Sequence, residues 1–207
     1  MARFGINSKN TLGISVWKIR EIAKEIGKDH DLAQELWKTK IHEARLLAAF
    51  IDDPEQVTER QMEDWVKDFD SWDVCDQVTT DLFDQTPYAY KKVFEWSERD
   101  EEFVRRAAFS MIAGLAVHDK KAKDGQFIEL FSLIVKTSED ERNYVRKAVN
   151  WALRNIGKRN SRLNKKAIQI GKKLQTSASK SARWIGNDAV KELESDAVQK
   201  RLAKKKK

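Results

Sequence analysis

The chain has 207 residues, of which 35% are charged and 41% are hydrophobic. This balance is too apolar for a disordered chain and too polar for an integral membrane protein, and no apolar run approaches the roughly 20 residues of a membrane span. The first ten residues lack the apolar core of a signal peptide, and the single cysteine excludes an internal disulfide framework. We therefore expect a cytoplasmic protein that makes no membrane contact.

With only two prolines and eight glycines, the chain has few helix breakers, which favours an all-helical fold. Apolar residues recur at helical spacing almost throughout. Gly27 is a plausible end of the first helix, Thr58 and Thr86 are plausible N-caps, and Ser138 has capping-box spacing to Glu141. The expected helices cover residues 16–26, 29–39, 41–51, 58–70, 71–84, 87–97, 100–116, 124–136, 138–157, 161–174 and 179–193.

After the first helix, these segments group into consecutive pairs, and the second members of the pairs resemble one another. Each of those has a basic residue just before or within an apolar run, as in IHEARLLAAFI and NYVRKAVNWAL. Helix pairs with periods of 30–45 residues predict a HEAT-like helical-repeat solenoid, an α-α superhelix whose second helices line a concave groove. A plain helix bundle is the alternative. We place the repeat domain at residues 1–193 and a basic C-terminal tail at 194–207.

Charge is distributed unevenly along the chain. Residues 158–207 hold 16 Lys/Arg and 4 Asp/Glu, a net charge of +12, whereas residues 1–157 carry a net −5. The lysine run at 204–207 is expected to be a solvated tail, but its removal still leaves +8 over residues 158–203. A basic region of this kind favours a polyanionic partner such as nucleic acid.

Equivalent positions on the second helices are expected to point into one groove. When the second helices are aligned, these positions hold four cations and one carboxylate: Arg45, Asp76, Arg106, Lys147 and Arg183. Tryptophans accompany them at helical spacing, with Trp72 four residues before Asp76, Trp151 four after Lys147, and Arg154 three further on. Basic side chains interleaved with aromatic rings suit phosphates and sugar or base faces. A solenoid adaptor for an acidic protein is the rival interpretation.

Three segments carry a resemblance to a known family. The segment Ser71-Trp72-Asp73-Val74-Cys75-Asp76 resembles a Trp-Asp-x-x-Asp motif of the DNA alkylation repair enzyme family, which comprises HEAT-like alkylpurine DNA glycosylases. Phe103-Val104-Arg105-Arg106-Ala107-Ala108 resembles the family segment that supplies a groove arginine. Lys147-Ala148-Val149-Asn150-Trp151-Ala152-Leu153-Arg154 resembles its Lys-Ala-x-x-Trp-x-Leu-Arg segment. The resemblance extends over roughly residues 4–193.

The resemblance implies a metal-independent DNA glycosylase that excises cationic N3- and N7-alkylated purines from duplex DNA. It makes Asp76, Trp72 and Trp151 the catalytic candidates. Arg106 and Arg154 would hold phosphates of the lesion strand, and we add Lys147, Arg183 and Arg45 as further DNA-binding candidates. Relatives that lack the aspartate bind DNA without excision, and this chain retains it. A non-catalytic module for damaged or branched DNA is the runner-up.

The chemistry agrees with these residue types. An N3- or N7-alkylated purine already carries positive charge and leaves as a neutral base, so the costly part is the oxocarbenium-like charge that grows on the deoxyribose. A fixed carboxylate near C1′ stabilises that charge and orients the attacking water. Two tryptophans beside the sugar would add cation–π attraction and exclude water.

Other constellations predict no additional chemistry. His30, His42 and His118 have no ligand spacing to each other or to Cys75, so we expect no metal site and no cofactor. Cys75 is expected to be a buried small hydrophobe rather than a reactive thiol. Asp73 is a rival to Asp76, about 60° away around the same helix. We expect a monomer.

Overall fold

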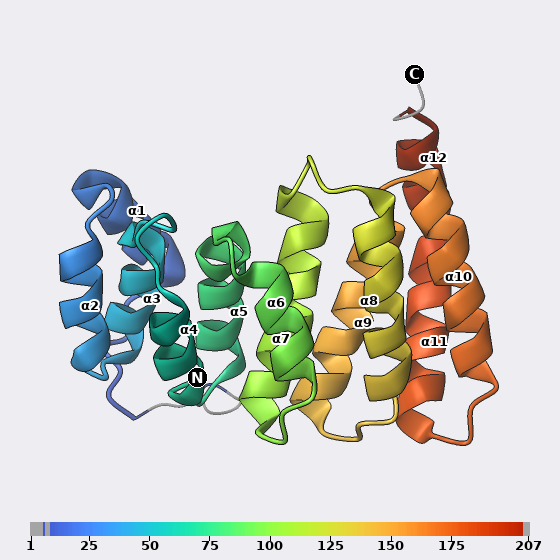
Figure 1. The fold of residues 1–207 in the computed structure, drawn as a ribbon, viewed down its shortest axis with the longest axis horizontal. Helices are drawn as coiled ribbons and strands as arrows, with labels where there is room; N and C mark the ends of the chain where they lie inside the picture. The colour runs from blue at the N-terminus through green and yellow to red at the C-terminus, as the bar shows by residue number, and fades with distance from the viewer. Residues whose placement is uncertain (1–5, 7–8, 205–207) are drawn as a thin grey trace.

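The computed structural model describes residue 6 and residues 9–204, and this part of the chain is entirely helical, without β-strands (Figure 1). This part contains twelve α-helices and one short 3-10 helix, and the two members of each consecutive pair from α2–α3 to α10–α11 run antiparallel (Figure 1). Their bounds are α1 Val16–Ile26, α2 His30–Lys38, α3 His42–Ile51, α4 Glu59–Lys67, α5 Trp72–Asp81, η2 Phe83–Gln85, α6 Ala89–Ser97, α7 Glu102–His118, α8 Asp124–Thr137, α9 Asn143–Gly157, α10 Ser161–Gln175, α11 Lys180–Leu193 and α12 Asp196–Lys204. The all-α helical-repeat prediction is confirmed.

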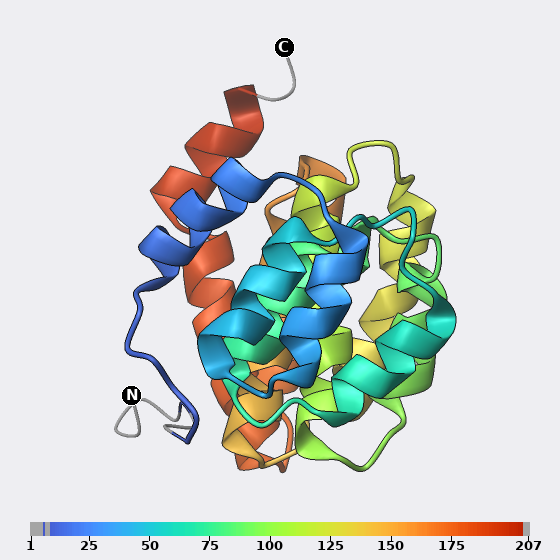
Figure 2. The same cartoon turned by 90° about the vertical axis from the view of Figure 1, so that its left-hand side faces the viewer.

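The helices stack in two layers. The second helices of the pairs, α3, α5, α7, α9 and α11, contact one another in sequence and form what we call the inner layer. The first helices of the pairs, α2, α4, α6, α8 and α10, form an outer layer that covers one face of the inner layer. On the opposite face, α1 lies against α3 (Figure 2). All five helices of the inner layer run in the same direction, so their N-terminal turns lie along the lower edge of the molecule in Figure 1.

The segment before α1 is fixed by one buried carboxylate. The Glu43 carboxylate of α3 accepts hydrogen bonds from the backbone N–H groups of Leu12, Gly13 and Ile14, at 2.8, 2.8 and 3.3 Å. Although burial works in the opposite direction, these bonds hold the pKa of Glu43 below its ordinary value. Gly13 has φ of +75°, a conformation that glycine adopts without steric cost. The carboxylate therefore sets where α1 starts against the inner layer.

A row of aromatic rings fills the core of the first three helix pairs, α2–α3, α4–α5 and α6–α7. The rings of Trp37 and Trp65 stack with centroids 4.0 Å apart, and Phe83 continues the row to Trp96 at 6.0 Å. All four side chains are buried. Three of the seven tryptophans are thus core residues, in keeping with the large apolar area that this side chain buries.

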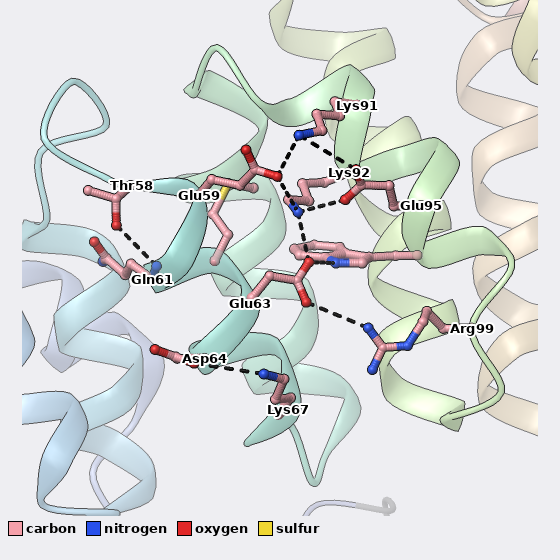
Figure 3. Close-up of polar contacts among 12 residues, drawn as sticks. Thr58, Glu59, Gln61, Glu63, Asp64, Lys67, Lys91, Lys92, Glu95 and Arg99 are labelled. Atoms are coloured by element: carbon pink, nitrogen blue, oxygen red, sulfur yellow. Dashed lines mark hydrogen bonds and ion pairs between the residues drawn. The ribbon is translucent and has the colours of Figure 1, made fainter.

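An ion network joins α4 to α6 (Figure 3). The Lys92 ammonium is almost entirely buried and lies 2.8, 2.8 and 2.6 Å from carboxylate oxygens of Glu59, Glu63 and Glu95. Trp96 donates its indole N–H to Glu63 at 2.7 Å. Hydrogen bonds from Lys91 and Lys92 lower the pKa of Glu59 to about 2. Because each carboxylate has a cationic partner, the network links the outer helices without leaving a bare buried charge.

Two helix starts differ from the sequence-based prediction. Ser138 does not cap α9: its hydroxyl donates to the carbonyl of Val135 and closes α8, and α9 begins only at Asn143. Thr86 similarly bonds back to Phe83, so α6 begins at Ala89. In both cases the hydroxyl satisfies a carbonyl of the preceding helix instead of an N–H of the next one.

A helix that we did not predict follows residue 193. In α12 the side chains of Val198 and Leu202 are buried, and the amide of Gln199 donates to Asn164 and to the carbonyl of Leu193. Residues 196–204 are therefore packed on the repeat rather than extended as a tail. Residues 205–207 lie outside the described part of the chain, and the domain boundary at 193 stays a prediction.

Candidate functional site

Asp76 and Arg106 form a buried ion pair between α5 and α7. The Arg106 Nε donates to Oδ1 of Asp76 at 2.9 Å, and its Nη2 donates to Oδ2 at 2.7 Å. Its Nη1 donates to the backbone carbonyl of Tyr144 on α9 at 2.6 Å. Side-chain exposure is 11% for Asp76 and 6% for Arg106. One guanidinium thus fixes the carboxylate bidentately and ties three helices of the inner layer together.

Small residues allow these helices to approach closely. Ala107 and Ala108 follow Arg106 on α7 and are fully buried. Further along the same helix, a Cβ added to Gly114 would lie 2.5 Å from a carboxylate oxygen of Asp84, so no larger side chain fits there. Between α5 and α7, Thr79 donates its hydroxyl to Ser110 at 2.8 Å. The close contact of α5 and α7 is what brings Arg106 within bonding distance of Asp76.

Burial has the largest effect on the pKa of Asp76. It raises the pKa of Asp76 above the ordinary aspartate value, although the positive charge of Arg106 opposes the shift. The adjacent thiol of Cys75 is wholly buried, and burial raises its pKa well above the usual value. As expected from the sequence, Cys75 is placed as a buried small side chain, and its thiol is not in the reactive ionised form.

The two candidate tryptophans lie on helices of the inner layer, Trp72 on α5 and Trp151 on α9. Trp72 is the first residue of α5, one turn before Asp76, and it is partly exposed. Trp151 is also partly exposed and lies on α9, seven residues after Tyr144, which is about 10 Å along the helix axis. Neither belongs to the buried core, in contrast to Trp37, Trp65 and Trp96. Their catalytic roles stay predictions.

Of the five cations proposed to bind DNA, two do not face solvent, which corrects our expectation that all point into an open groove. Arg106 is buried as described. Arg45 is also buried, donates to the carboxylate and the carbonyl of Asp68 at 2.8 and 3.1 Å, and lies over the ring of Trp37. Their partners, Asp68 just after α4 and Asp76 on α5, come from other repeats, and helical periodicity along one segment does not reveal such partners. Direct contact of either arginine with phosphate stays a prediction.

The other three cations are more accessible. Arg154 is half-buried and pairs with Glu192 of α11 at 2.5 Å. Arg183 donates to the carbonyls of Ser177 and Ala178 and thereby fixes the connection before α11. Lys147 is exposed, and among the described residues no carboxylate forms an ion pair with it. Lys147 is therefore the candidate whose charge is presented to solvent most directly.

Asp73, the rival carboxylate, points elsewhere. It lies 2.8 Å from Nε2 of His42 on α3, and both side chains are buried. The hydrogen bond to Asp73 raises the pKa of His42, and the same partner keeps the pKa of Asp73 below its ordinary value against the effect of burial. Asp73 thus serves an α3–α5 contact, whereas Asp76 serves the α5–α7 contact.

Exposed aromatic residues were missed by the sequence argument. Trp184 on α11 is 37% exposed, and the guanidinium of Arg146 on α9 lies 4.7 Å from its ring centroid. Trp17 on α1 is 81% exposed. Both rings lie on helices of the inner layer or next to it, where they can stack on a ligand. The spacing of Trp184 directly after Arg183 was visible, but periodicity alone does not separate it from the core tryptophans.

Within the described residues, no group of three or more His, Cys, Asp or Glu side chains is arranged to hold a metal ion. In the same part of the chain, no helix is both long and apolar enough to cross a bilayer. The functional groups at the candidate site are the Asp76 carboxylate, the Arg106 guanidinium and the indole rings of Trp72 and Trp151.

Comparison with known proteins assigns the chain to a family. The sequence model described as DNA alkylation repair enzyme matches residues 1–193. The chain belongs to the DNA alkylation repair enzyme family. The match includes the segments around Asp76, Arg106 and Trp151. No curated protein matches the chain significantly.

One solved structure has the same fold over nearly the whole chain. It is described as "a new family of proteins related to the HEAT-like repeat DNA glycosylases with affinity for branched DNA structures"; its TM-score is 0.80 at 19% identity, over 97% of this chain and 87% of that one. At this identity the likeness shows a HEAT-like repeat fold and nothing more about activity. A designed armadillo repeat protein in complex with the peptide (KR)4 matches at 15% identity over 89% of this chain and 88% of that one, with a TM-score of only 0.39.

Proposed function

We propose that this member of the DNA alkylation repair enzyme family binds duplex DNA along the inner layer and hydrolyses the N-glycosidic bond of N3- or N7-alkylated purines. The observation that carries the proposal is the Asp76 carboxylate, which is held in one orientation by Arg106 and lies one turn from the partly exposed Trp72. Preorganised charge of this kind stabilises a transition state without reorganisation at the moment of reaction.

The reaction needs one broken bond and one water. The bond between C1′ and the purine nitrogen breaks, and its electron pair neutralises the positive charge of the alkylated base, which leaves. Water adds to the oxocarbenium-like C1′ and releases a proton to solvent. In this proposal Asp76 faces the growing positive charge, and Trp72 and Trp151 lie beside the sugar, where their π-faces attract the same charge.

Arg106 acts as a positioning residue. Burial alone would favour the neutral form of Asp76, because a charged carboxylate loses its hydration in the interior. The guanidinium opposes this effect and keeps the two carboxylate oxygens in a fixed plane. We expect excision to decline on acidification at a higher pH than an ordinary aspartate would give, because burial raises the pKa of Asp76.

A second candidate function is DNA binding without excision. The observation that favours it is again the ion pair, because a guanidinium 2.7–2.9 Å from the carboxylate cancels part of its field. The structural relative with affinity for branched DNA gives this candidate a precedent on the same fold. The two candidates share the DNA-binding surface and differ only in whether a base is released.

The deciding experiment is incubation of the protein with duplex DNA that contains 7-methylguanine, followed by chromatography of the released bases. Release at a rate above spontaneous depurination, lost in Asp76→Asn, supports the glycosylase. Tight binding without release supports the second candidate. Absence of binding to linear and to branched duplex DNA would exclude both candidate functions and favour a protein partner.

The DNA-binding surface has its own test. Each phosphate contact makes the fall of log K with log salt steeper by about 0.9. Lys147 is exposed, so Lys147→Gln should make the slope less steep by about 0.9. Arg45 is buried, and Arg45→Gln tests its predicted phosphate contact: an equal change would support that contact, and an unchanged slope would contradict it. Because Arg45 also bonds Asp68, its variant needs a melting curve before binding is measured.

A further inference from the structure

A second basic surface lies away from the candidate active site. A cleft of about 450 Å³ opens where α7 and α9 end and α8 and α10 begin, at the upper edge of the molecule in Figure 1. Ala116 lines it, ten residues after Arg106 on α7, which is about 15 Å along the helix axis. The cleft and the Asp76–Arg106 pair are therefore separate sites on the same repeats.

Cations outnumber carboxylates four to one in the lining of the cleft. Its charged lining consists of Lys120, Lys158, Arg159 and Arg201, with Asp124 as the acidic residue. Lys158 is paired with Glu192 at 2.7 Å, and Asp124 accepts a hydrogen bond from Asn160 at 2.7 Å. Lys120 and Arg201 are exposed, and they donate hydrogen bonds to the backbone carbonyls of Val117 and Lys158, respectively. The lining therefore keeps a net positive charge that an anion can reach.

The walls of the cleft are held rigidly. The guanidinium of Arg159 donates to the carbonyls of Ala116 and Ala122 at 3.1 Å each and to the carbonyl of Asp119, and it lies 4.4 Å from the ring centroid of Phe127. On the other side, α12 is anchored by buried Val198 and Leu202, which places Arg201 at the opening. Cations on fixed supports lose little freedom when they bind a ligand.

The basic surface continues beyond the cleft along α10. A shallow opening next to it is lined by Arg162, Lys165 and Lys166, and α10 contains no acidic residue over Ser161–Gln175. Arg162 is 76% exposed in its side chain. A small phosphorylated ligand would need the cleft alone. An extended row of cations with little opposing charge suits a chain of phosphates instead.

We propose that this surface, defined by Lys120 and Arg201 at the cleft and by Arg162, Lys165 and Lys166 on α10, is a second DNA-backbone-binding site. The inference rests on the proposed function, which places one duplex on the inner layer. The second site then binds the phosphodiester backbone of another segment of the same DNA, such as a second arm at a branch. Phosphate contacts at this site position the DNA and carry no sequence information.

The test compares a cleft variant with a matched control. Lys120→Gln/Arg201→Gln removes two exposed cleft cations, and Lys38→Gln/Lys67→Gln removes two exposed cations from the outer helices α2 and α4. Both are titrated over a salt series against a short linear duplex and a four-way junction with arms of the same length. If the double cleft variant melts early, Lys120→Gln alone, in the α7–α8 connection, is used.

For the junction, the cleft variant should lower the salt slope by about 1.8, or about 0.9 for Lys120→Gln alone, whereas the control should leave it unchanged. Neither variant should change binding of the short duplex or single-turnover base release at saturating enzyme. An unchanged junction slope in the cleft variant, or an equal loss in the control, overturns the second site. Absence of base release in the wild-type protein would refute only the glycosylase, because the slope is measured without excision.

Discussion

Replacement of Asp76 by asparagine tests the ion pair and the proposed chemistry together. The variant leaves the Arg106 guanidinium buried opposite a neutral amide. Breaking a buried pair in this way costs about 3–5 kcal/mol, which is a large part of the roughly 5–15 kcal/mol that stabilises a folded domain. At about 2–4 °C per kcal/mol for a chain of this size, the Tm should fall by roughly 6–20 °C. Asp76→Leu/Arg106→Met removes both charges and should melt close to the wild-type protein.

The same geometry ranks the two variants in excision. At an effective dielectric constant of about 20, a carboxylate about 4 Å from a unit positive charge attracts it by about 4 kcal/mol. A guanidinium about 8 Å away, behind the carboxylate, repels the same charge by about 2 kcal/mol. Asp76→Asn loses the attraction and keeps the repulsion, which corresponds to about 10³-fold in rate, whereas the double variant loses only the net 2 kcal/mol, or about 30-fold.

The assay is single-turnover release of 7-methylguanine at saturating enzyme, preceded by a thermal melt of each variant at the assay temperature. We expect Asp76→Asn to be both the less stable and the slower of the two. A double variant that is stable and excises at the wild-type rate would remove Asp76 from the reaction. A Tm of Asp76→Asn equal to that of the wild-type protein would contradict the burial of the Asp76–Arg106 pair.

The remaining predictions concern the tryptophans and the α4–α6 network. Trp72→Ala and Trp151→Ala should slow excision. Because both rings are partly exposed, each change should lower the free energy of unfolding by less than the ~3–5 kcal/mol expected for a core change such as Trp96→Ala. Urea unfolding with Trp96→Ala as the reference checks this, and an equal loss of stability would place the ring concerned in the core. Lys92→Met should lower the free energy of unfolding by roughly 1–3 kcal/mol, less than a fully buried pair because its carboxylate partners are partly exposed; no change in urea midpoint would contradict this. Since the pKa of Glu59 is lowered to about 2, its contribution is present above pH 4.5 and should be lost between pH 4.5 and 2, and acid unfolding of Glu59→Gln should lack that component.

The repeat architecture could be predicted because its signals are local. The helical spacing of apolar residues and caps such as Thr58, whose side chain accepts from the backbone N–H of Gln61, mark helices within a few residues of their observed bounds. Ser138 shows the limit of such signals. Its spacing to Glu141 fits a capping box, but its hydroxyl donates to the carbonyl of Val135 at the end of α8. Whether Ser138 ends one helix or begins the next therefore depends on where α8 ends.

The site could be predicted only in part, because its side chains form hydrogen bonds with residues that lie on other helices and are far apart in the sequence. Periodicity places Asp76 and Arg106 on corresponding turns of α5 and α7 but gives no distance between them. Whether equivalent charged positions face a groove or the neighbouring helix depends on a rotation of a few tens of degrees, and the small residues of α7 decide it here. The sequence therefore predicts that Arg45 and Arg106 point into the groove, whereas each forms hydrogen bonds with an aspartate of another helix pair.

Chemistry and affinity are separated along this chain. The catalytic candidates Asp76, Trp72 and Trp151 belong to residues 1–157, whose net charge is −5, and several cations of that part are engaged in protein contacts. Exposed cations are most frequent along the chain after residue 157, where the net charge is +12 through residue 207, although Lys120 and Lys147 precede this part. Binding energy gained at a remote part of a substrate can hold the reacting part in place. Arg106 is bonded to Asp76, so the candidate active site has one cation fewer for binding phosphate. In the proposed arrangement, C-terminal contacts to the DNA backbone would compensate for this. Loss of the basic surface would then weaken DNA binding without altering the geometry at Asp76.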